Sequence, residues 1–445
     1  MKTENHKREL FLVEMGGDKV LLYQPLMRTA AVINHQAANV VNRFLEDQQS
    51  GFSVEEKEIL TDLKNAKLIS DEPYNQPGFP QDYGFHPYEV TLFLTSRCNL
   101  RCRYCYAEGG TRSEELDWEI CKAGIDFAIE SSLETNRKDF LLGFHGSGEP
   151  TMAWDNMKRS VLYAHEHGEK NGLKAVIHTA TNGVLNDEQR AFIVKYFSGV
   201  NVSFDGTEDI QNHNRPFANG QGSFDKVFES LKYFDQQNFN FAIRVTVSNT
   251  AVVRMKEIVE FLGNSLPALR EIHIEPLWLC GRCLTTGETP PSPEDFIVNF
   301  RQATEAAKEL GLSIKYSGAR LHTITNRFCG APGEGFSVLP GGAVTSCYEV
   351  CESDDPRAEL FHYGKYNYDT KKFEFDQNKI NRLRKLSVEN IAFCKDCFCK
   401  WHCAGDCLSK ALSTFSTDGH NGSVRCTINR ELTLYQIKDM IEAIQ

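Results

Sequence analysis

The sequence has no long apolar run and no excess of positive charge. No segment approaches the about 18 consecutive apolar residues that a membrane-spanning helix requires, and no apolar segment of the signal-peptide type follows the polar residues 1–9. The formal net charge is −11 and basic residues are scattered, whereas a protein that holds nucleic acid by its phosphates needs a basic face. We therefore expect a cytoplasmic protein with neither a membrane nor a nucleic-acid partner.

What the sequence does have is an unusual number of cysteines in an otherwise ordinary globular composition. Hydrophobic residues make up 41% and charged residues 24%, as in an ordinary globular protein. The length of 445 residues suits about three folding units. The 15 cysteines are an odd number, and disulfides are rare in the cytoplasm. Metal or cluster binding is therefore the better explanation. One group of cysteines lies within residues 98–105, and most of the others lie within residues 329–426.

Three cysteines, Cys98, Cys102 and Cys105, stand close enough in sequence for one loop to turn them toward one point. They follow residues 89–95, a β-branched and aromatic segment typical of a strand. Thiolates are the ligands of iron–sulfur clusters, and three ligands leave one iron open for chemistry. A structural zinc site or buried free cysteines are the alternatives, but zinc needs a fourth ligand and residues 106–111 contain no Cys or His.

From residue 89 onward, segments typical of strands alternate with segments typical of helices. The strand-like segments after the first are 140–145, 175–181, 200–204, 241–247 and 271–276. The helix-like segments are 118–131, 157–171, 187–196, 224–237 and 253–262. This alternation predicts an α/β fold of βα units on a parallel sheet. Functional residues should gather at the carboxyl ends of the strands, as they do in complete βα barrels.

The CxxxCxxC spacing, with aromatic Tyr104 directly before the third cysteine, resembles the radical S-adenosylmethionine (SAM) enzymes. The resemblance implies an open, partial (β/α)6 TIM barrel and a [4Fe–4S] cluster held by Cys98, Cys102 and Cys105. It also implies that SAM chelates the open iron through its amino and carboxylate groups. One-electron cleavage of SAM would then give a 5′-deoxyadenosyl radical that abstracts hydrogen from a substrate.

Motifs at the ends of the following strands are similar to others of that family. Residues 146–151, GSGEPT, resemble the GGEPT stretch that faces the SAM amino group, with Ser147 in place of the first glycine. Residues 181–183 and the SFDG of 203–206, followed by His213 and Arg215, match later positions of the family pattern. The SAM-binding residues that the resemblance implies are Tyr104, Ser147, Gly148, Glu149, Thr181, Asn182, Ser203, Asp205 and Arg215.

The remaining cysteines resemble the SPASM domain, which holds two auxiliary clusters. The motifs follow one another in the same order as in that domain and span about 100 residues: a cysteine, a gap, Gly-x4-Cys, CxxCx5CxxxC and a final cysteine. Carried over by position, the outer [4Fe–4S] cluster would be held by Cys394, Cys397, Cys403 and Cys426. The inner one would be held by Cys329, Cys347 and Cys407. Zinc is the alternative, because paired CxxC ligands also build zinc ribbons.

The fourth ligand of the inner cluster is not given by this spacing. Cys351, four residues after Cys347, is the leading candidate because its thiol can reach the same cluster. Cys280 and Cys283 are runners-up, and Cys399 lies inside the outer-cluster motif. If none of them binds, an open iron could take a substrate thiolate.

Residues 1–75 read as a separate module. A hairpin is predicted around Gly16, Gly17 and Asp18, and Asn34 would cap the helix that follows. Ser53 and Glu56 form the capping box of a second helix, after which residues 68–69 are expected to return as a strand. Strands followed by short helices resemble the winged-helix leader-recognition elements of peptide-modifying enzymes; a structural extension is the alternative. The expected domains are this module (1–75), a linker (76–88), the radical SAM barrel (89–310), the SPASM domain (311–427) and a C-terminal helix (428–445).

Together these resemblances imply a maturase of a ribosomally made precursor peptide, of the sactisynthase or cyclophane-synthase type. Such an enzyme closes a thioether or carbon–carbon cross-link and takes its electron from reduced flavodoxin or ferredoxin. One alternative is an anaerobic sulfatase-maturating enzyme, which forms formylglycine. That class usually carries an Asp directly after the Cys of Gly-x4-Cys, where Tyr348 stands here. The other alternative is a non-catalytic, zinc-stabilised peptide-binding protein.

Overall fold

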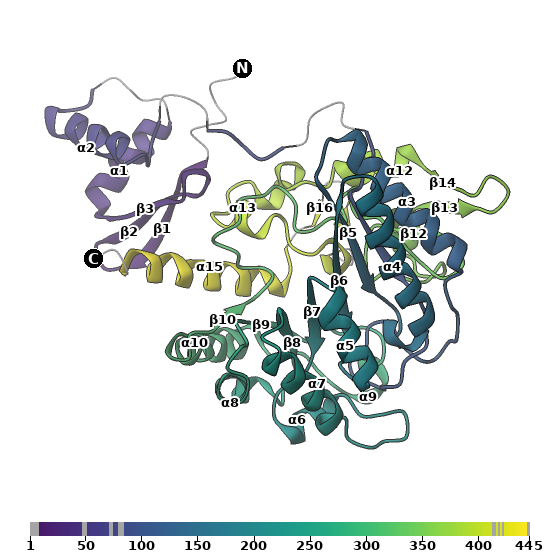
Figure 1. Ribbon diagram of the computed structural model, residues 1–445. Helices are drawn as coiled ribbons and strands as arrows, with labels where there is room; N and C mark the ends of the chain where they lie inside the picture. The colour runs from purple at the N-terminus through teal and green to yellow at the C-terminus, as the bar shows by residue number, and fades with distance from the viewer. Residues whose placement is uncertain are drawn as a thin grey trace. The chain divides into compact units, whose positions relative to one another are not determined.

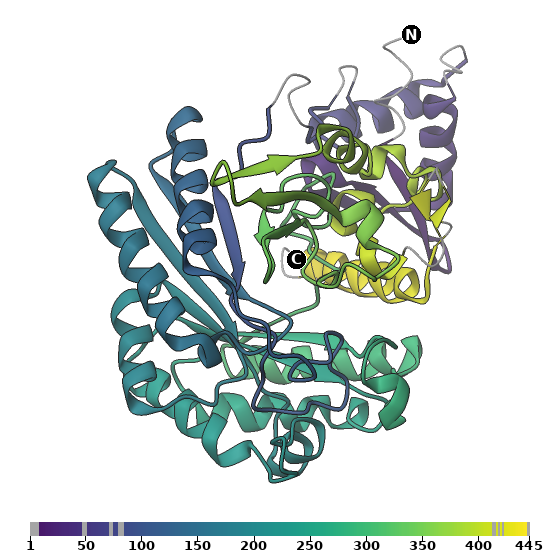
Figure 2. The ribbon, with the colours of Figure 1, turned by 90° about the vertical axis from the view of Figure 1, so that its right-hand side faces the viewer.

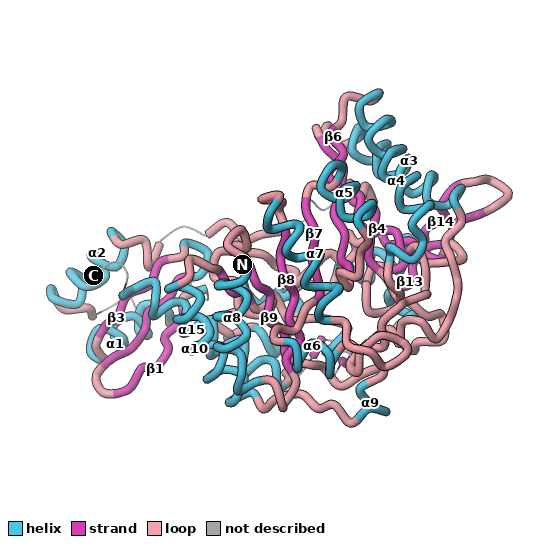
Figure 3. Tube along the Cα trace, turned by 60° about the horizontal axis from the view of Figure 1, so that its bottom comes forward, coloured by secondary structure: helices cyan, strands magenta, loops and turns pink. Residues whose placement is uncertain are grey.

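The alternation of strand and helix from residue 89 onward builds a parallel sheet in the computed structural model. Six strands pair side by side in chain order, all parallel, and Figure 3 shows β7, β8 and β9 running next to one another. The six strands are β4 (Glu89–Phe93), β5 (Asp139–His145), β6 (Lys174–Thr181), β7 (Gly199–Ser203), β8 (Phe241–Val247) and β9 (Glu271–Pro276). This arrangement confirms the predicted partial (β/α)6 barrel.

The structure describes residues 9–46, 51–70, 74–78, 84–411, 415–416, 419–420 and 422–442. The chain forms two units: one comprises residues 84–317 and 329–385, and the other comprises residues 1–83, 318–328 and 386–445. We call them the barrel unit and the terminal unit. Both contain part of the cysteine-rich region, and part of the predicted linker, residues 79–83, lies outside the described residues.

Helices cover one face of the barrel sheet, as Figure 2 shows for the blue-to-teal part of the chain. The helices in this part of the chain are α3 (Trp118–Glu134), α4 (Trp154–Lys170), α5 (Asp187–Tyr196), α6 (Glu208–Asn214), α7 (Phe224–Gln236), α8 (Met255–Ser265), the short α9 (Cys283–Thr286) and α10 (Pro293–Glu309). In β8, Phe241, Ile243 and Val245 are buried, whereas Ala242, Arg244 and Thr246 alternate with them on the other face. We call that second face the inner face of the sheet.

Shorter strands extend the barrel sheet at both edges. β10 (Ser313–Lys315) pairs in parallel with β9, and β11 (Ser337–Val338) pairs in parallel with β4. Beyond β11 the pairing becomes antiparallel, through β12 (Ala343–Thr345), β13 (His362–Asn367) and β14 (Lys372–Phe375). The short helices α11 (Ala358–Phe361) and α12 (Gln377–Arg384) flank these strands in sequence. The strands within residues 337–375 therefore continue the sheet beyond β4, the strand that leads into the three-cysteine loop.

The terminal unit begins with a three-stranded antiparallel sheet in the order β1 (Phe11–Gly16), β2 (Lys19–Gln24), β3 (Thr29–Ile33). The predicted hairpin is confirmed: Gly16 and Gly17 form its turn, both with positive φ. Helices α1 (His35–Leu45) and α2 (Val54–Asn65) follow, with the predicted Asn34 cap and the Ser53–Glu56 capping box both present. Later elements of the unit are α13 (Lys400–Cys403), α14 (Leu408–Ala411), β15 (Phe415–Ser416), β16 (Gly419–His420) and α15 (Val424–Glu442).

Both faces of the β1–β3 sheet are covered. On one face Leu22 packs with Val41 and Phe44 of α1, and on the other Leu21 and Tyr23 pack with residues of α15. Figure 1 shows α15 running beside this sheet. The Tyr23 hydroxyl lies 2.5 Å from Nε2 of His402. The N-terminal sheet thus shares its core with the C-terminal helix.

One expectation for this module was wrong. Residues 68–69 do not return as a strand: Leu68 donates its backbone N–H to the Leu63 carbonyl, directly after the end of α2. Leu68 and Ile69 instead bury their side chains in the core beneath α1 and α2. The third strand is β3, which precedes the helices. No helix among the described residues combines the length and the hydropathy that a membrane span requires.

Candidate active site

The three predicted cluster cysteines lie in residues 94–111, which we call the cluster loop, directly after β4. Backbone hydrogen bonds fasten this loop to the end of α6 and the residues after it: Arg101 donates to the Pro216 carbonyl (2.7 Å) and Arg103 to the Asn214 carbonyl (2.8 Å). The Arg101 guanidinium also closes the loop on itself, donating to the carbonyls of Cys98 (2.7 Å) and Gly110 (3.0 Å). The loop thus has a fixed backbone at the carboxyl end of the sheet.

The thiols of Cys98, Cys102 and Cys105 are half-buried and interact electrostatically with one another. Burial raises the pKa of the Cys102 thiol to about 12, and the buried Arg215 guanidinium acts in the opposite direction. The Gly109 N–H donates to the Cys105 sulfur at 3.4 Å. Across the described residues, no three His, Cys, Asp or Glu side chains already converge on a metal position. The fit to a [4Fe–4S] cluster rests on the donor chemistry: three thiols in one loop and a compensating cation.

Glu149 joins the two loops that the sequence motifs predict to hold SAM. Its carboxylate is buried and accepts hydrogen bonds from the Thr181 hydroxyl (2.7 Å), the Asn182 backbone N–H (2.7 Å) and the Thr151 hydroxyl (2.8 Å). Burial raises the pKa of Glu149 although these hydrogen bonds oppose it. Asn182 reaches on to the cluster loop, where its side-chain amide donates to Asn99 (2.7 Å). The Glu149 carboxylate therefore ties the end of β6 to the GSGEPT loop, and the Asn182 amide ties both to the cluster loop.

Gly148 is required where the GSGEPT loop meets the cluster loop. A Cβ atom there would lie 2.3 Å from the Arg97 carbonyl oxygen and 2.6 Å from that of Thr95. Beside it, Ser147 is buried, and its carbonyl oxygen stands where a Cβ on Gly109 would come within 2.6 Å. The two backbones approach too closely for side chains, as expected of a loop that presents main-chain groups to a ligand.

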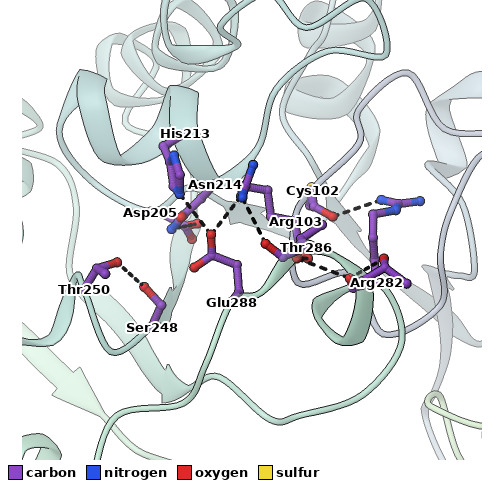
Figure 4. Close-up of polar contacts among 11 residues, drawn as sticks. Cys102, Arg103, Asp205, His213, Asn214, Ser248, Thr250, Arg282, Thr286 and Glu288 are labelled. Atoms are coloured by element: carbon purple, nitrogen blue, oxygen red, sulfur yellow. Dashed lines mark hydrogen bonds and ion pairs between the residues drawn. The ribbon is translucent and has the colours of Figure 1, made fainter.

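Asp205, Tyr104 and Arg215 form a buried polar chain at the end of β7. The Tyr104 hydroxyl donates to the Asp205 carboxylate (2.6 Å), and Nη1 of Arg215 donates to the Tyr104 hydroxyl (2.8 Å). The Asn214 amide also donates to Asp205, at 3.0 Å (Figure 4). Burial raises the pKa of Asp205 and outweighs the nearby Arg215 charge. Nε of Arg215 is buried with no hydrogen-bond partner, so this one donor is still available to a ligand.

Ser203 is the last residue of β7 and alternates with buried Val202, which places it on the inner face. Its register partner on β8 is Arg244. The predicted SAM-contact residues therefore fall into two groups, one fastened around Glu149 and one around Asp205, with Ser203 between them in chain order. Their assignment to SAM stays a prediction.

The four cysteines predicted for the outer auxiliary cluster lie near one another in the terminal unit. Cys394 interacts electrostatically with Cys397 and Cys426, and Cys403 interacts with the other three. A hydrogen bond from the Cys399 thiol, aided by the Arg430 cation, lowers the pKa of Cys397 to about 6 against the effect of burial. A common ligand set of Cys394, Cys397, Cys403 and Cys426 is compatible with this arrangement and stays a prediction.

The cysteines predicted for the inner cluster are divided between the units. Cys329 and Cys347 belong to the barrel unit and Cys407 to the terminal unit. The Cys351 thiol donates to the Tyr348 carbonyl at 3.1 Å and interacts electrostatically with Cys105 of the cluster loop. Burial raises its pKa. Cys351 thus lies in the region of the cluster loop, and its role as the fourth inner ligand stays a prediction.

The sequence interpretation missed a group of side chains around Tyr348 on the barrel sheet. The Tyr348 ring stacks on His145 and its hydroxyl lies 3.0 Å from the Thr91 hydroxyl. Phe93 packs against both rings, and Tyr348 itself is 39% exposed. The only sequence signal was the alternation in β4 and β5, which places Thr91, Phe93 and His145 on one face of the sheet.

Comparisons with known proteins match the part of the chain that contains the cluster loop. The Radical SAM superfamily model matches residues 92–262. A cysteine-type anaerobic sulfatase-maturating enzyme of Clostridium perfringens is 27% identical over 329 residues, covering 70% of this chain and 86% of that protein. Several other curated relatives are matched over only about half of their own length.

Two solved structures show the same fold. Native anSMEcpe with bound AdoMet and Cp18Cys peptide has a TM-score of 0.64 and 21% identity, covering 80% of this chain and 98% of that one. Streptococcus suis SuiB bound to precursor peptide SuiA has a TM-score of 0.55 and 14% identity, covering 94% of this chain and 98% of that one. The matched residues include all three thiols of the cluster loop and the strands that position them. The protein is therefore a radical SAM enzyme, of the class whose cofactors are SAM and a [4Fe–4S] cluster.

Proposed function

We propose that this enzyme matures a ribosomally made precursor peptide by abstracting hydrogen from one of its residues and closing an intramolecular thioether or carbon–carbon cross-link. The single observation that carries the proposal is the N-terminal sheet of the terminal unit. It is a small folded element with β1 and β3 as its outer strands. A sheet edge can bind an extended peptide by adding it as a further strand.

The TM-score is higher for the anSMEcpe complex than for the SuiB–SuiA complex, but the share of this chain that is covered favours cross-linking over sulfatase maturation. The SuiB–SuiA complex is similar over 94% of the chain, whereas the anSMEcpe complex is similar over 80%. The residue after Cys347 is Tyr348, where sulfatase maturases usually carry an Asp that takes a proton. The third alternative, a zinc-stabilised adaptor, is non-catalytic and is therefore incompatible with the assignment as a radical SAM enzyme.

The roles of the chain's own residues follow from their positions. Cys98, Cys102 and Cys105 would hold the cluster, and the loop at Gly148 and Glu149 would present main-chain groups to SAM. When bound, the two cofactors supply one-electron, hydrogen-abstracting chemistry. The inner face of the sheet would receive the peptide.

The auxiliary clusters belong to the same proposal, which has three [4Fe–4S] clusters in all. Cys351 is proposed as the fourth ligand of the inner cluster, so that four thiolates restrict it to electron transfer. Cys351→Ala should then lose or distort the paramagnetic signal of the inner cluster. An unchanged signal together with full cross-linking activity would leave the inner cluster with an open iron.

Co-expression with a candidate short precursor peptide, followed by mass spectrometry of the product, tests the function. A cross-link removes two hydrogen atoms from the peptide. Formylglycine made from cysteine instead exchanges sulfur and two hydrogens for oxygen, so the two reactions differ in product mass. The Cys98→Ala enzyme is the matched control and should return unmodified peptide. Purified enzyme with reduced flavodoxin or ferredoxin should reproduce the mass change, and formylglycine in its place would reject the cross-linking proposal.

A further inference from the structure

We propose that the segment between β9 and α10 positions the cluster loop, and that Arg282 is the positioning residue through which it does so. We call residues 281–288 the bracket. The proposal depends on the radical SAM assignment and not on the identity of the substrate. It concerns how the cluster loop is held when the cluster and SAM are bound.

Arg282 binds the cluster loop at three carbonyl groups. Its backbone N–H donates to the Cys105 carbonyl (3.0 Å), Nη1 donates to the Cys102 carbonyl (2.9 Å), and Nη2 donates to the Gly109 carbonyl (3.0 Å). Figure 4 shows the guanidinium beside Cys102. The two side-chain bonds use the planar fork of arginine, which lysine cannot reproduce. Arg282 therefore fixes the backbone of two predicted cluster ligands and the end of the turn that follows them.

Gly281 lets the bracket approach the cluster loop this closely. Its φ is +55°, and a Cβ atom there would lie 2.4 Å from the Cys105 carbonyl oxygen and 2.6 Å from the Tyr106 carbonyl oxygen. Any side chain would push the bracket away from the loop and strain a left-handed backbone. Gly281 and Arg282 thus act together, one by close approach and the other by hydrogen bonding.

A cysteine pair shapes the turn that presents these two residues. The Cys280 N–H donates to the Cys283 sulfur (3.0 Å), and the Cys283 thiol donates back to the Cys280 carbonyl (2.8 Å). Cys283 is fully buried. This gives the CGRC sequence a structural explanation that needs no bound metal.

A second set of contacts anchors the other end of the bracket to Arg103, which lies between two cluster ligands. The Thr286 hydroxyl donates to the Arg103 carbonyl (2.7 Å), and Nη2 of Arg103 donates to the Thr286 carbonyl (3.1 Å). Nε of Arg103 donates to the Glu288 carboxylate (2.8 Å), which also lies 2.9 Å from Nε2 of His213 (Figure 4). The Glu288 carboxylate is buried. The cluster loop is therefore held at both ends of the 102–105 segment.

The geometry has two physical consequences for the cofactor site. Hydrogen bonds that fix the backbone of ligand residues orient the ligands themselves, and such outer contacts commonly change metal affinity 10- to 100-fold when removed. A cation near a cluster also favours its more negative, reduced state, because hydrogen bonding and local charge set cluster potentials. We expect Arg282 to keep the thiols in a SAM-binding geometry and to raise the reduction potential of the cluster.

The test compares four variants of the full chain, reconstituted anaerobically with iron and sulfide. Arg282→Met removes the fork and the charge, Arg282→Lys keeps only the charge, and Gly281→Ala keeps both but displaces the bracket. Arg270→Met is the matched control, because exposed Arg270 also donates to backbone carbonyls but at the opposite end of β9. The measurements are SAM affinity by equilibrium dialysis, the paramagnetic spectrum of the reduced cluster with and without SAM, and its reduction potential.

Arg282→Met should weaken SAM binding at least about tenfold, alter the SAM-dependent spectrum and lower the potential. Arg282→Lys should restore the potential but not the SAM affinity, and Gly281→Ala should alter the affinity and spectrum with the charge intact. Arg270→Met should match the wild type in all three. The proposal fails if Arg282→Met matches the wild type, or if Arg270→Met shifts the same measurements equally. If Arg282→Met does not fold, a folded Gly281→Ala with an unchanged SAM affinity and spectrum overturns it.

Discussion

The imidazole ring of His145 stacks on the phenol ring of Tyr348, with ring centroids 4.7 Å apart and planes inclined by 24°. The two residues are far apart in sequence: His145 ends β5, and Tyr348 follows the cysteine of the Gly-x4-Cys motif. The stack joins the barrel sheet to the segment that the sequence predicts to hold the inner cluster. The stack also covers part of the His145 imidazole, and burial favours the neutral form of that ring.

The first prediction follows from that neutrality. Burial, and secondarily the Arg244 cation, lower the pKa of His145 from 6.5 to about 4. Between these values the unfolded chain binds the proton and the folded chain does not, so the free energy of unfolding falls as pH is lowered. His145 should therefore cost about 2 kcal/mol of stability between pH 7 and pH 5.

Denaturant unfolding of wild type and His145→Phe at the two pH values measures this contribution. Phenylalanine keeps a ring for the stack but takes up no proton, so the variant should lose less stability at pH 5. Val54→Phe is the control, because it adds the same ring at an exposed position that carries no titratable group, and it should keep the wild-type pH dependence. If the free energy of unfolding depends equally on pH in wild type and His145→Phe, His145 has the same pKa in the folded and unfolded states, which contradicts the prediction.

The second prediction concerns the two glycines of the GSGEPT loop. At Gly148 an added Cβ would meet backbone atoms at 2.3 Å, whereas at Gly146 the nearest atom is 3.5 Å away. Gly148→Ala should therefore displace the loop and weaken SAM binding by at least about fivefold, since a cost of about 1 kcal/mol or more is expected from forced backbone movement. Gly146→Ala should bind SAM as the wild type does. If the two variants bind SAM with equal affinity, the GSGEPT loop does not take part in SAM binding.

The third prediction is the iron content. Anaerobically reconstituted protein should hold about 12 iron atoms, four in each of three cubane clusters. Replacing Cys98, Cys102 and Cys105 together with Ala should remove about four of them and abolish SAM cleavage. Cys121, which is buried in α3, provides a control in which Cys121→Ala keeps all the iron. Zinc in place of iron in the purified protein would contradict the cluster assignments.

The fourth prediction tests peptide binding at the N-terminal sheet. Deleting the whole module would expose Leu21 and Tyr23, which share a core with α15, so a point change at the sheet edge is the cleaner experiment. Val32 of β3 is 41% exposed, and a charged residue on an edge strand opposes strand addition. Val32→Arg should weaken binding of a labelled precursor peptide about tenfold, while SAM cleavage without peptide continues.

The control for Val32→Arg is Val54→Arg, because Val54 is 74% exposed and belongs to α2 and not to a strand of the sheet. It should bind the precursor as the wild type does. If Val32→Arg also binds normally, β3 is not the edge to which the peptide adds.

The sequence by itself determined the features that depend on residues close together in the chain. The strands of the barrel sheet could be predicted because their β-branched and apolar runs are local, and the hairpin and both helix caps depend on a few adjacent residues. The cluster loop could be predicted because Cys98, Cys102 and Cys105 fall within eight residues. The third strand of the N-terminal sheet was placed wrongly because two apolar residues, Leu68 and Ile69, suit a buried turn as well as a strand.

Only the tertiary structure decided which distant residues meet around those motifs. The sequence pointed to Asp205 and Arg215 by resemblance, but their link through the Tyr104 hydroxyl appears only once β7 and the cluster loop are side by side. Arg282 carries no sequence signal for its role, since its three acceptors are backbone carbonyls about 175 residues away and a carbonyl is the same in every residue. Contacts of this kind depend on how the whole sheet brings chain segments together, so local patterns cannot encode them.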